Sequence, residues 1–186
     1  TGSANPFDNV TTNSFSALAF VDIDNDNDLD VVRGFYDAFQ LYQNDGGALT
    51  MLTGAANPFD GIHVGRWSAP AFADLDGDND MDLISGENYG KLLYFRNDTG
   101  NYNQIFGAKN PFDGVISANY SSPVFFDYDG DTDLDFFSGN SVGTIKMFKE
   151  ENDSIEEILD SINPFIGLDF GQNSTITFVN FDQDNH

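Results

Sequence analysis

Aspartates at every second position are the most distinctive feature of this 186-residue chain. Gly and Asn separate several of these carboxylates, so each run crowds hard oxygen ligands onto a tight loop. A Ca²⁺ ion binds six to eight such oxygens. Ca²⁺ is therefore the first hypothesis for what these residues hold. Three complete runs and a shorter fourth supply the candidate metal ligands Asp22, Asp24, Asp26, Asp28, Asp30, Asp74, Asp76, Asp78, Asp80, Asp82, Asp127, Asp129, Asp131, Asp133, Asp135, Asn180, Asp182 and Asp184.

Recurrence separates these runs from an ordinary acidic loop. One Asp-rich run is most simply a solvated, self-repelling segment. The complete runs, however, begin 52 and 53 residues apart, and each lies between two apolar segments. Two carboxylates about 5 Å apart repel by roughly 3 kcal/mol at an effective dielectric constant near 20. A bound divalent cation would remove this cost in every repeat.

A second motif repeats with the same period. Asn-Pro-Phe begins at residues 5, 57, 110 and 163. A period of about 50 residues is typical of propellers, solenoids and other repeat arrays. We expect three full units and a partial fourth, with the boundaries 1–52, 53–105, 106–158 and 159–186.

Each unit reads as four short strands. In the second unit, the segments 68–73, 81–86, 91–96 and 102–106 are rich in β-branched and aromatic residues and are separated by Gly, Asn and Asp. This pattern predicts a four-stranded antiparallel sheet. Residues 153–162 could form a turn or two of helix, but the repeat favours a strand there. Two phenylalanine series are expected to pack between sheets: Phe7, Phe59, Phe112 and Phe165, and Phe20, Phe72, Phe125 and Phe178.

Composition narrows the possible partners and compartment. The chain is 40% hydrophobic, which is enough for a packed core, and its formal net charge of −24 disfavours nucleic acid and anionic membrane surfaces. It has no Cys, hence no disulfides, and no apolar run long enough to insert into a membrane. Because resting cytosolic calcium is low, several Ca²⁺ loops without EF-hand helices favour an extracellular or cell-surface location.

The acidic runs and their flanks resemble a known repeat. The segment from Phe72 to Gly86, with Gly34 and Gly139 at the matching positions, is similar to the FG-GAP/VCBS repeat of integrin-α-like calcium-binding β-propellers. The resemblance implies an all-β fold of β-propeller type, built from four-stranded antiparallel blades. It also implies Ca²⁺ ligands at the first, third, fifth and ninth positions of each loop, with the seventh carbonyl (Asp28, Asp80 and Asp133). The fourth copy departs from the pattern, because Asn180 stands first and a ninth residue is missing.

Two other calcium motifs fit less well, and the number of units leaves the assembly open. An EF-hand needs Gly at its sixth and Glu at its twelfth position, which these loops lack, and nonapeptide repeats occur in tandem. Propellers usually have four to eight blades. Three and a half units therefore indicate a fragment of a longer chain, a ring completed by other subunits, or an open stacked array. A bare sheet edge would join other chains or copies.

Other chemistry is sparse. Five Asn-x-Ser/Thr sequons occur, of which Asn97 and Asn152 fall on predicted hairpin turns where a glycan would point into solvent. Only His63 and His186 could act as bases near neutral pH, and a carboxylate pair repeated in every unit suits a structural ion better than an active site. We expect no enzyme. The sequons are Asn9, Asn97, Asn119, Asn152 and Asn173.

The sequence thus predicts a calcium-stabilised extracellular module with a structural or adhesive role, as part of a larger surface protein or fibre. The alternative is a lectin-like carbohydrate-binding propeller. In that case Trp67 and its equivalents Phe15 and Tyr120 would point outward between blades and stack on sugars.

Overall fold

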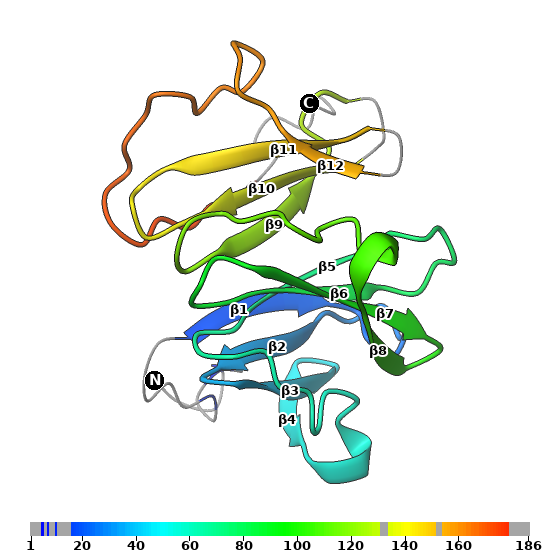
Figure 1. The fold of residues 1–186 in the computed structure, drawn as a ribbon. Coiled ribbons are helices and arrows are strands. Elements are labelled where there is room, and N and C mark those ends of the chain that lie inside the picture. Colours follow the sequence, from blue (N-terminus) through cyan, green and yellow to red (C-terminus); the bar gives the residue numbers. More distant parts are fainter. Residues whose placement is uncertain are drawn as a thin grey trace.

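The computed structural model describes residues 5, 7, 10, 16–130, 134–151 and 154–178. In these residues the chain forms three four-stranded antiparallel sheets, each with its strands in chain order (Figure 1). The sheets lie one above another, and a short 3₁₀ helix follows each of the first two: η1 (Gly54–Ala56) and η2 (Gly107–Lys109). The strands are β1 (Ser16–Val21), β2 (Asp30–Phe35), β3 (Ala38–Asp45), β4 (Ala48–Leu52), β5 (Ala69–Ala73), β6 (Asp82–Gly86), β7 (Leu92–Asp98), β8 (Asn101–Ile105), β9 (Ser122–Phe126), β10 (Asp135–Gly139), β11 (Ile145–Glu151) and β12 (Ser154–Glu157).

The observed strands follow the sequence pattern closely. The four segments predicted in the second unit correspond to β5–β8, and the segment with helical potential after Asp153 contains β12. All five residues of β6 are buried, because this sheet is covered on both faces. Successive side chains of a strand point to opposite faces. Accordingly, Leu83 joins the core shared with the first sheet, and Ile84 joins the core shared with the third.

The Asn-Pro-Phe motif places an aromatic ring between neighbouring sheets. In the first copy between sheets, the Asn57 side chain accepts a hydrogen bond from the Phe59 amide (3.1 Å), which forms a local turn. Phe59 is 1% exposed and contacts the rings of Phe39 and Phe72. Phe112 does the same between the second and third sheets, and Phe165 packs on the outer face of the third. Each aromatic wedge therefore belongs to the connection that leads into the next unit.

A glycine and a serine form the seam between consecutive units. Gly86 ends β6, and a side chain there would overlap the backbone carbonyl of Ser121. Ser121 donates its amide to the Glu87 carbonyl (3.3 Å) and its hydroxyl to the Lys91 carbonyl (2.9 Å). The same close approach joins Gly34 to Ser68 and Gly139 to Ser174. Only Gly permits this distance, which explains its recurrence in the motif.

The first unit lacks part of the packing predicted for it. Phe7 and Phe20 contact each other edge-on but are 41% and 53% exposed, so the expectation that both are core residues is wrong. Their equivalents Phe59 and Phe72 pack on the preceding sheet. No sheet precedes β1 among the described residues, so Phe20 lacks the neighbouring sheet that Phe72 has, although Val31 and Tyr42 on the same face are buried.

Candidate metal centre

Each acidic run forms the loop between the first and second strands of its sheet. The loop curls because its fourth and sixth residues adopt left-handed backbone conformations, which Gly and Asn tolerate better than other residues. In the first loop these are Asn25 (φ 61°) and Asn27 (φ 73°), and in the second they are Gly77 (φ 77°) and Asn79 (φ 71°). Asn25 thus adopts the left-handed conformation that Gly77 and Gly130 adopt at the same position of the other two loops.

Curling brings three carboxylates of each loop together. One oxygen from each member of a cluster lies within 4.8 Å of the others. Ca²⁺–oxygen distances are 2.3–2.6 Å, so oxygens at this spacing can contact a single ion. The clusters are Asp22, Asp24 and Asp30; Asp74, Asp76 and Asp78; and Asp127, Asp129 and Asp135.

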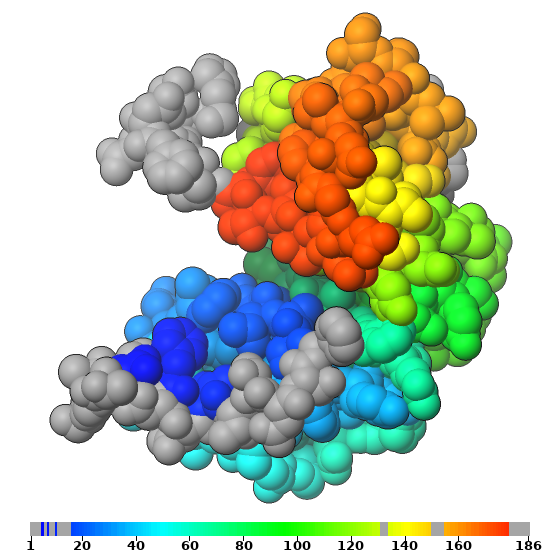
Figure 2. Space-filling view, turned by 90° about the vertical axis from the view of Figure 1, so that its left-hand side faces the viewer, coloured from blue at the N-terminus to red at the C-terminus, as the bar shows by residue number. Residues whose placement is uncertain are grey.

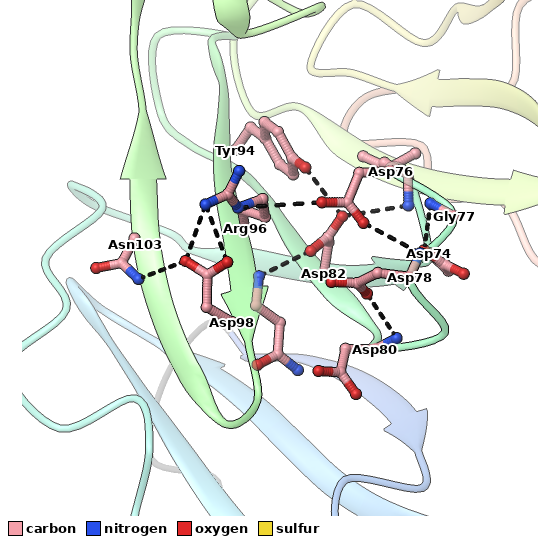
Figure 3. A network of polar contacts seen from close by, with 12 residues as sticks. Asp74, Asp76, Gly77, Asp78, Asp80, Asp82, Tyr94, Arg96, Asp98 and Asn103 are labelled. Atoms are coloured by element: carbon pink, nitrogen blue, oxygen red, sulfur yellow. Dashed lines mark hydrogen bonds and ion pairs between the residues drawn. The ribbon is translucent and has the colours of Figure 1, made fainter.

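The aspartate at the ninth position of each loop is buried. Asp82 is fully buried and accepts hydrogen bonds from the amides of Leu75 (3.2 Å) and Asn97 (2.7 Å) and from the Tyr94 hydroxyl (2.9 Å) (Figure 3). Asp30 makes the corresponding bonds with two backbone amides. Burial, the largest influence, raises the pKa of both carboxyls, and the amide bonds oppose it. A buried charge of this kind needs a counter-charge to be stable.

The aspartates at the first and fifth positions of the loop bind the loop's own backbone. Asp74 accepts a hydrogen bond from the amide of Gly77 (2.8 Å), and Asp78 accepts one from Asp80 (2.9 Å) (Figure 3). Asp74 also accepts one from the amide of Asn79 (2.9 Å). These bonds fix the curl, while each carboxylate keeps lone pairs for a cation.

The side chain of the aspartate at the seventh position points away from the cluster. Asp80 accepts a hydrogen bond from the Thr99 amide (3.0 Å), and Asp28 accepts one from the Gly46 amide (3.0 Å). Both donors lie in the turn between the third and fourth strands of the same sheet. The seventh side chain thus connects the acidic loop to that turn, a role that the alternating pattern did not reveal.

Five predicted ligands fall outside the described residues. They stay predictions: Asp131, Asp133, Asn180, Asp182 and Asp184.

A third-strand residue approaches each cluster from the side, and it was not anticipated. Gln43 Nε2 donates to Asp24 Oδ2, Arg96 Nε lies 4.0 Å from Asp76 Oδ2, and Lys149 Nζ lies 3.0 Å from Asp129 Oδ2. The three residues stand 53 positions apart, so aligning the repeats would have revealed them. In the third loop an ammonium group already lies where cationic charge is favoured.

Comparison with known proteins bears on this geometry. The family model for the FG-GAP-like repeat matches residues 22–85 and again residues 74–138, each match running from one acidic loop through the next. The chain belongs to the FG-GAP-like repeat family. A search of curated proteins found no significant match.

The donor set fits the Ca²⁺ that FG-GAP-like repeats often bind. All the clustered groups are carboxylates, the hard oxygen donors that Ca²⁺ prefers, and thiolate and imidazole ligands are absent from the clusters. The first, third and ninth positions cluster in two loops, and the first, third and fifth cluster in the other. The residues present therefore suit a hard divalent cation.

The prediction that a glycan on Asn97 would point into solvent is wrong. Asn97 is 8% exposed, and its amide group donates to the Met81 carbonyl (3.2 Å) and the Tyr102 hydroxyl (3.3 Å). A glycan on it would not project into solvent from this fold. Asn119 and Asn173 are exposed, whereas Asn9 and Asn152 lie outside the described residues.

A separate cavity lies where the units of this FG-GAP-like chain converge. Its volume is about 250 Å³, and its walls carry no charged side chain. Trp67 and Tyr120 contact each other there with ring centroids 4.5 Å apart, and Asn173 is the equivalent residue of the last unit. All three have left-handed backbones (φ 60°, 57° and 59°). Trp67 and Tyr120 therefore face a shared cavity rather than the outside, and Phe15 lies outside the described residues.

Groups with catalytic potential are few in the described part of the chain. FG-GAP-like repeats are generally non-catalytic. His63 Nδ1 lies 3.2 Å from Asp37 Oδ2 in an exposed pair, and His186 falls outside the described residues. Among the described residues, no helix is long and apolar enough to cross a membrane.

Proposed function

We propose that this chain is a calcium-stabilised module with a structural or adhesive role in an extracellular or cell-surface protein or fibre. One observation carries the proposal: a cluster of three carboxylates recurs in the loop between the first and second strands of three successive sheets. An isolated acidic cluster on a surface is unremarkable, but three at equivalent positions indicate a shared ligand. The predominantly extracellular occurrence of FG-GAP-like repeats supports the location.

Calcium would act on the fold through the loop ends of the sheets. When bound, the ion supplies two positive charges to a site of mutually repelling carboxylates. The chain's own residues then connect that site to the rest of the sheet. Asp82 ties the loop to β7, and Asp80 ties it to the turn before β8. Cation binding is thereby coupled to the pairing of all four strands.

We infer that the sheets are blades of a propeller-type array, with units at 1–52, 53–105, 106–158 and 159–186. The first strands β1, β5 and β9 lie next to one another. A second, larger hollow is lined by β1, β5, β9 and residues 175–177. Figure 2 shows this side of the molecule, with an opening between the first unit in blue and the last in red. Inner strands around a common hollow are the arrangement expected of propeller blades.

The partners that fit this array are other protein chains or further copies. The outer face of β1 exposes Leu18 (44%) and Phe20 (53%), where later units carry a neighbouring sheet. A net charge of −24 makes nucleic acid an unsuitable partner. Native mass measured with and without a chelator tests this part: a calcium-dependent assembly supports it, and a monomer in both conditions contradicts it.

Calcium binding itself is tested by equilibrium dialysis followed by elemental analysis. We expect at least one Ca²⁺ per described loop, removable by EDTA. The triple variant Asp24→Asn, Asp76→Asn and Asp129→Asn removes the carboxylate at the third position of each loop and should lose this calcium. As a control, Asp60→Asn and Asp113→Asn remove exposed carboxylates outside the loops and should not. Absence of bound calcium in the parent protein would contradict the proposal.

A carbohydrate-binding role is the second candidate, supported by the Trp67–Tyr120 cavity. A neutral wall with two aromatic rings and several hydroxyls offers the stacking and hydrogen-bonding groups that a sugar ring needs. Strained backbones at bulky residues also concentrate at ligand sites. A glycan array tests it: binding that disappears in Trp67→Ala and Tyr120→Ala but persists in Tyr89→Ala, an exposed ring outside the cavity, would support it. An array without hits would contradict it.

A further inference from the structure

The three acidic loops differ most in the third-strand residue that lies beside them. Gln43, Arg96 and Lys149 occupy equivalent positions on β3, β7 and β11. Each approaches the aspartate at the third position of its own loop, namely Asp24, Asp76 or Asp129. The carboxylates at positions one, three, five, seven and nine are the same in all three loops. The third-strand residue therefore adds a different charge beside three loops that carry the same aspartates.

Gln43 leaves the first cluster with its full negative charge. Its amide group donates one hydrogen bond to Asp24, and it contributes no positive charge. Asp24 remains a carboxylate with free lone pairs next to Asp22 and Asp30. A divalent cation entering this loop meets attraction from the carboxylates and no opposing charge from β3.

Lys149 presents the opposite case in the third loop. Its ammonium group lies 3.0 Å from Asp129 Oδ2, an oxygen of the carboxylate cluster. A divalent cation that used this oxygen would lie close to a like charge, or the lysine would have to move away. Coulomb repulsion over such a distance is substantial even at a surface-like dielectric constant. Binding at the third loop therefore carries a cost that the first loop does not have.

Arg96 is intermediate because its nitrogen lies farther from the third-position carboxylate (4.0 Å) than that of Lys149 does (3.0 Å). Its guanidinium donates to Asp98 (2.9 and 3.0 Å), and Asn103 supports Asp98 from the next strand (3.1 Å) (Figure 3). Its Nε stays 4.0 Å from Asp76. Asp98 partly compensates the arginine charge, and the guanidinium does not occupy an oxygen of the cluster as closely as Lys149 does.

We propose that the third-strand residue grades the affinity of the loops for a divalent cation, from highest in the first loop (Gln43) through the second (Arg96) to lowest in the third (Lys149). This inference rests on the proposed calcium binding. At low calcium the first loop fills and Lys149 serves as the counter-charge of the third. The third sheet then gains its ion only at higher calcium concentrations, so the chain responds to calcium over a wide range.

Calorimetric titration of single-loop proteins with CaCl₂ tests the grading. In the 186-residue chain, two of the three complete loops are silenced by changing the aspartate at the third position to Asn, and Asp182→Asn and Asp184→Asn are included throughout. The dissociation constants of the three proteins should rise in the order first, second, third loop. In the third-loop protein, Lys149→Gln should lower the dissociation constant roughly tenfold.

The reverse substitution in the first loop provides an independent test in case the Lys149→Gln variant fails to fold. Gln43→Lys in the first-loop protein should raise the dissociation constant roughly tenfold. The matched control is Lys146→Gln, which removes the same charge from the same strand, where Lys146 pairs with Glu157 instead (2.8 Å). It should change the third-loop constant less than twofold.

The outcomes separate the two proposals. If all three loops bind calcium but neither Lys149→Gln nor Gln43→Lys changes the dissociation constant for calcium, the grading is wrong and calcium binding stands. If none of the loops binds calcium, the proposed function fails and the grading fails with it. Affinities that move in the expected directions support both.

Discussion

The seams between sheets and the acidic loops at their ends are held together in opposite ways. At the seam, Gly86 meets Ser121 in a neutral, buried contact whose hydrogen bonds are all supplied by the protein. In the loop, Asp74, Asp76 and Asp78 gather like charges within 4.8 Å of one another. The seam therefore needs no ligand, whereas the loop gathers negative charges that a bound cation would offset. Calcium sensitivity should be a property of the loops alone.

The largest effect is expected from closing the seam with a side chain. Gly86→Val would drive its side chain into the Ser121 backbone, and we expect a loss of about 4 kcal/mol or more, the range of severe core disruption. The loss should be the same in calcium and in EDTA, as measured by urea unfolding. Ala108→Val, at an exposed position of η2, is the control. A loss confined to calcium-loaded protein would contradict the division between seam and loop.

Removing an aromatic wedge should be nearly as costly. Phe112 is 1% exposed and contacts Tyr94, Phe125 and Phe136, so Phe112→Ala should destabilise by about 3–5 kcal/mol. Phe106→Ala, at a ring that is 71% exposed, should cost little. Chemical denaturation with and without calcium gives the comparison, and equal losses for the two variants would argue against the packing described.

A loop carboxylate should show an effect whose sign depends on calcium. Asp76 receives one long backbone bond (3.3 Å), so Asp76→Asn perturbs the loop's own structure little. With calcium, loss of a ligand should lower stability by about 1–3 kcal/mol. In EDTA, removing a like charge should leave stability unchanged or slightly raised. Thermal melts in both buffers test this, with Asp60→Asn as the control, and a loss of similar size in EDTA would contradict the account.

The smallest effect expected is an inversion of pH dependence. Burial raises the pKa of Asp30 and Asp82 above the usual 3.8, so in EDTA the folded state takes up protons first as the pH falls. Their contribution to stability is then fully present below pH 3.8 and is lost as the pH rises through the raised pKa values. With calcium, acid protonates the ligands and releases the ion, so the melting temperature should fall instead. Parallel curves in the two buffers would contradict this.

Much of the fold could be predicted because it is local and repeated. Strand positions, the curl of the loops and the burial of Phe59 and Phe112 follow from alternation, Gly and Asn placement, and period. The match to FG-GAP-like repeats confirms the family that Phe72 to Gly86 indicated. The exposure of Phe20 was not predicted, because its burial depends on a preceding sheet, and none precedes β1 among the described residues.

The parts of the site that sequence could not predict are contacts across strands and units. The Asn97 side chain turns inward because the Met81 carbonyl and Tyr102 hydroxyl are within reach, which depends on the twist of the sheet. For Asp80 the sequence predicted a role for the backbone carbonyl, but it did not reveal that the side chain binds the Thr99 amide of a turn 19 residues later. Trp67 and Tyr120 meet because their units converge. Each contact depends on the relative placement of elements rather than on spacing along the chain.

The most direct test of the central claim is a thermal melt in calcium and in EDTA, with ionic strength matched by NaCl so that screening does not differ. The account predicts a clear rise of the melting temperature in calcium, since one site contributes about 2.7 kcal/mol when free calcium is 100 times the dissociation constant. The rise should shrink in the triple variant Asp24→Asn, Asp76→Asn and Asp129→Asn. Identical melts of the parent protein in the two buffers would contradict the claim that the acidic loops hold calcium to stabilise the sheets.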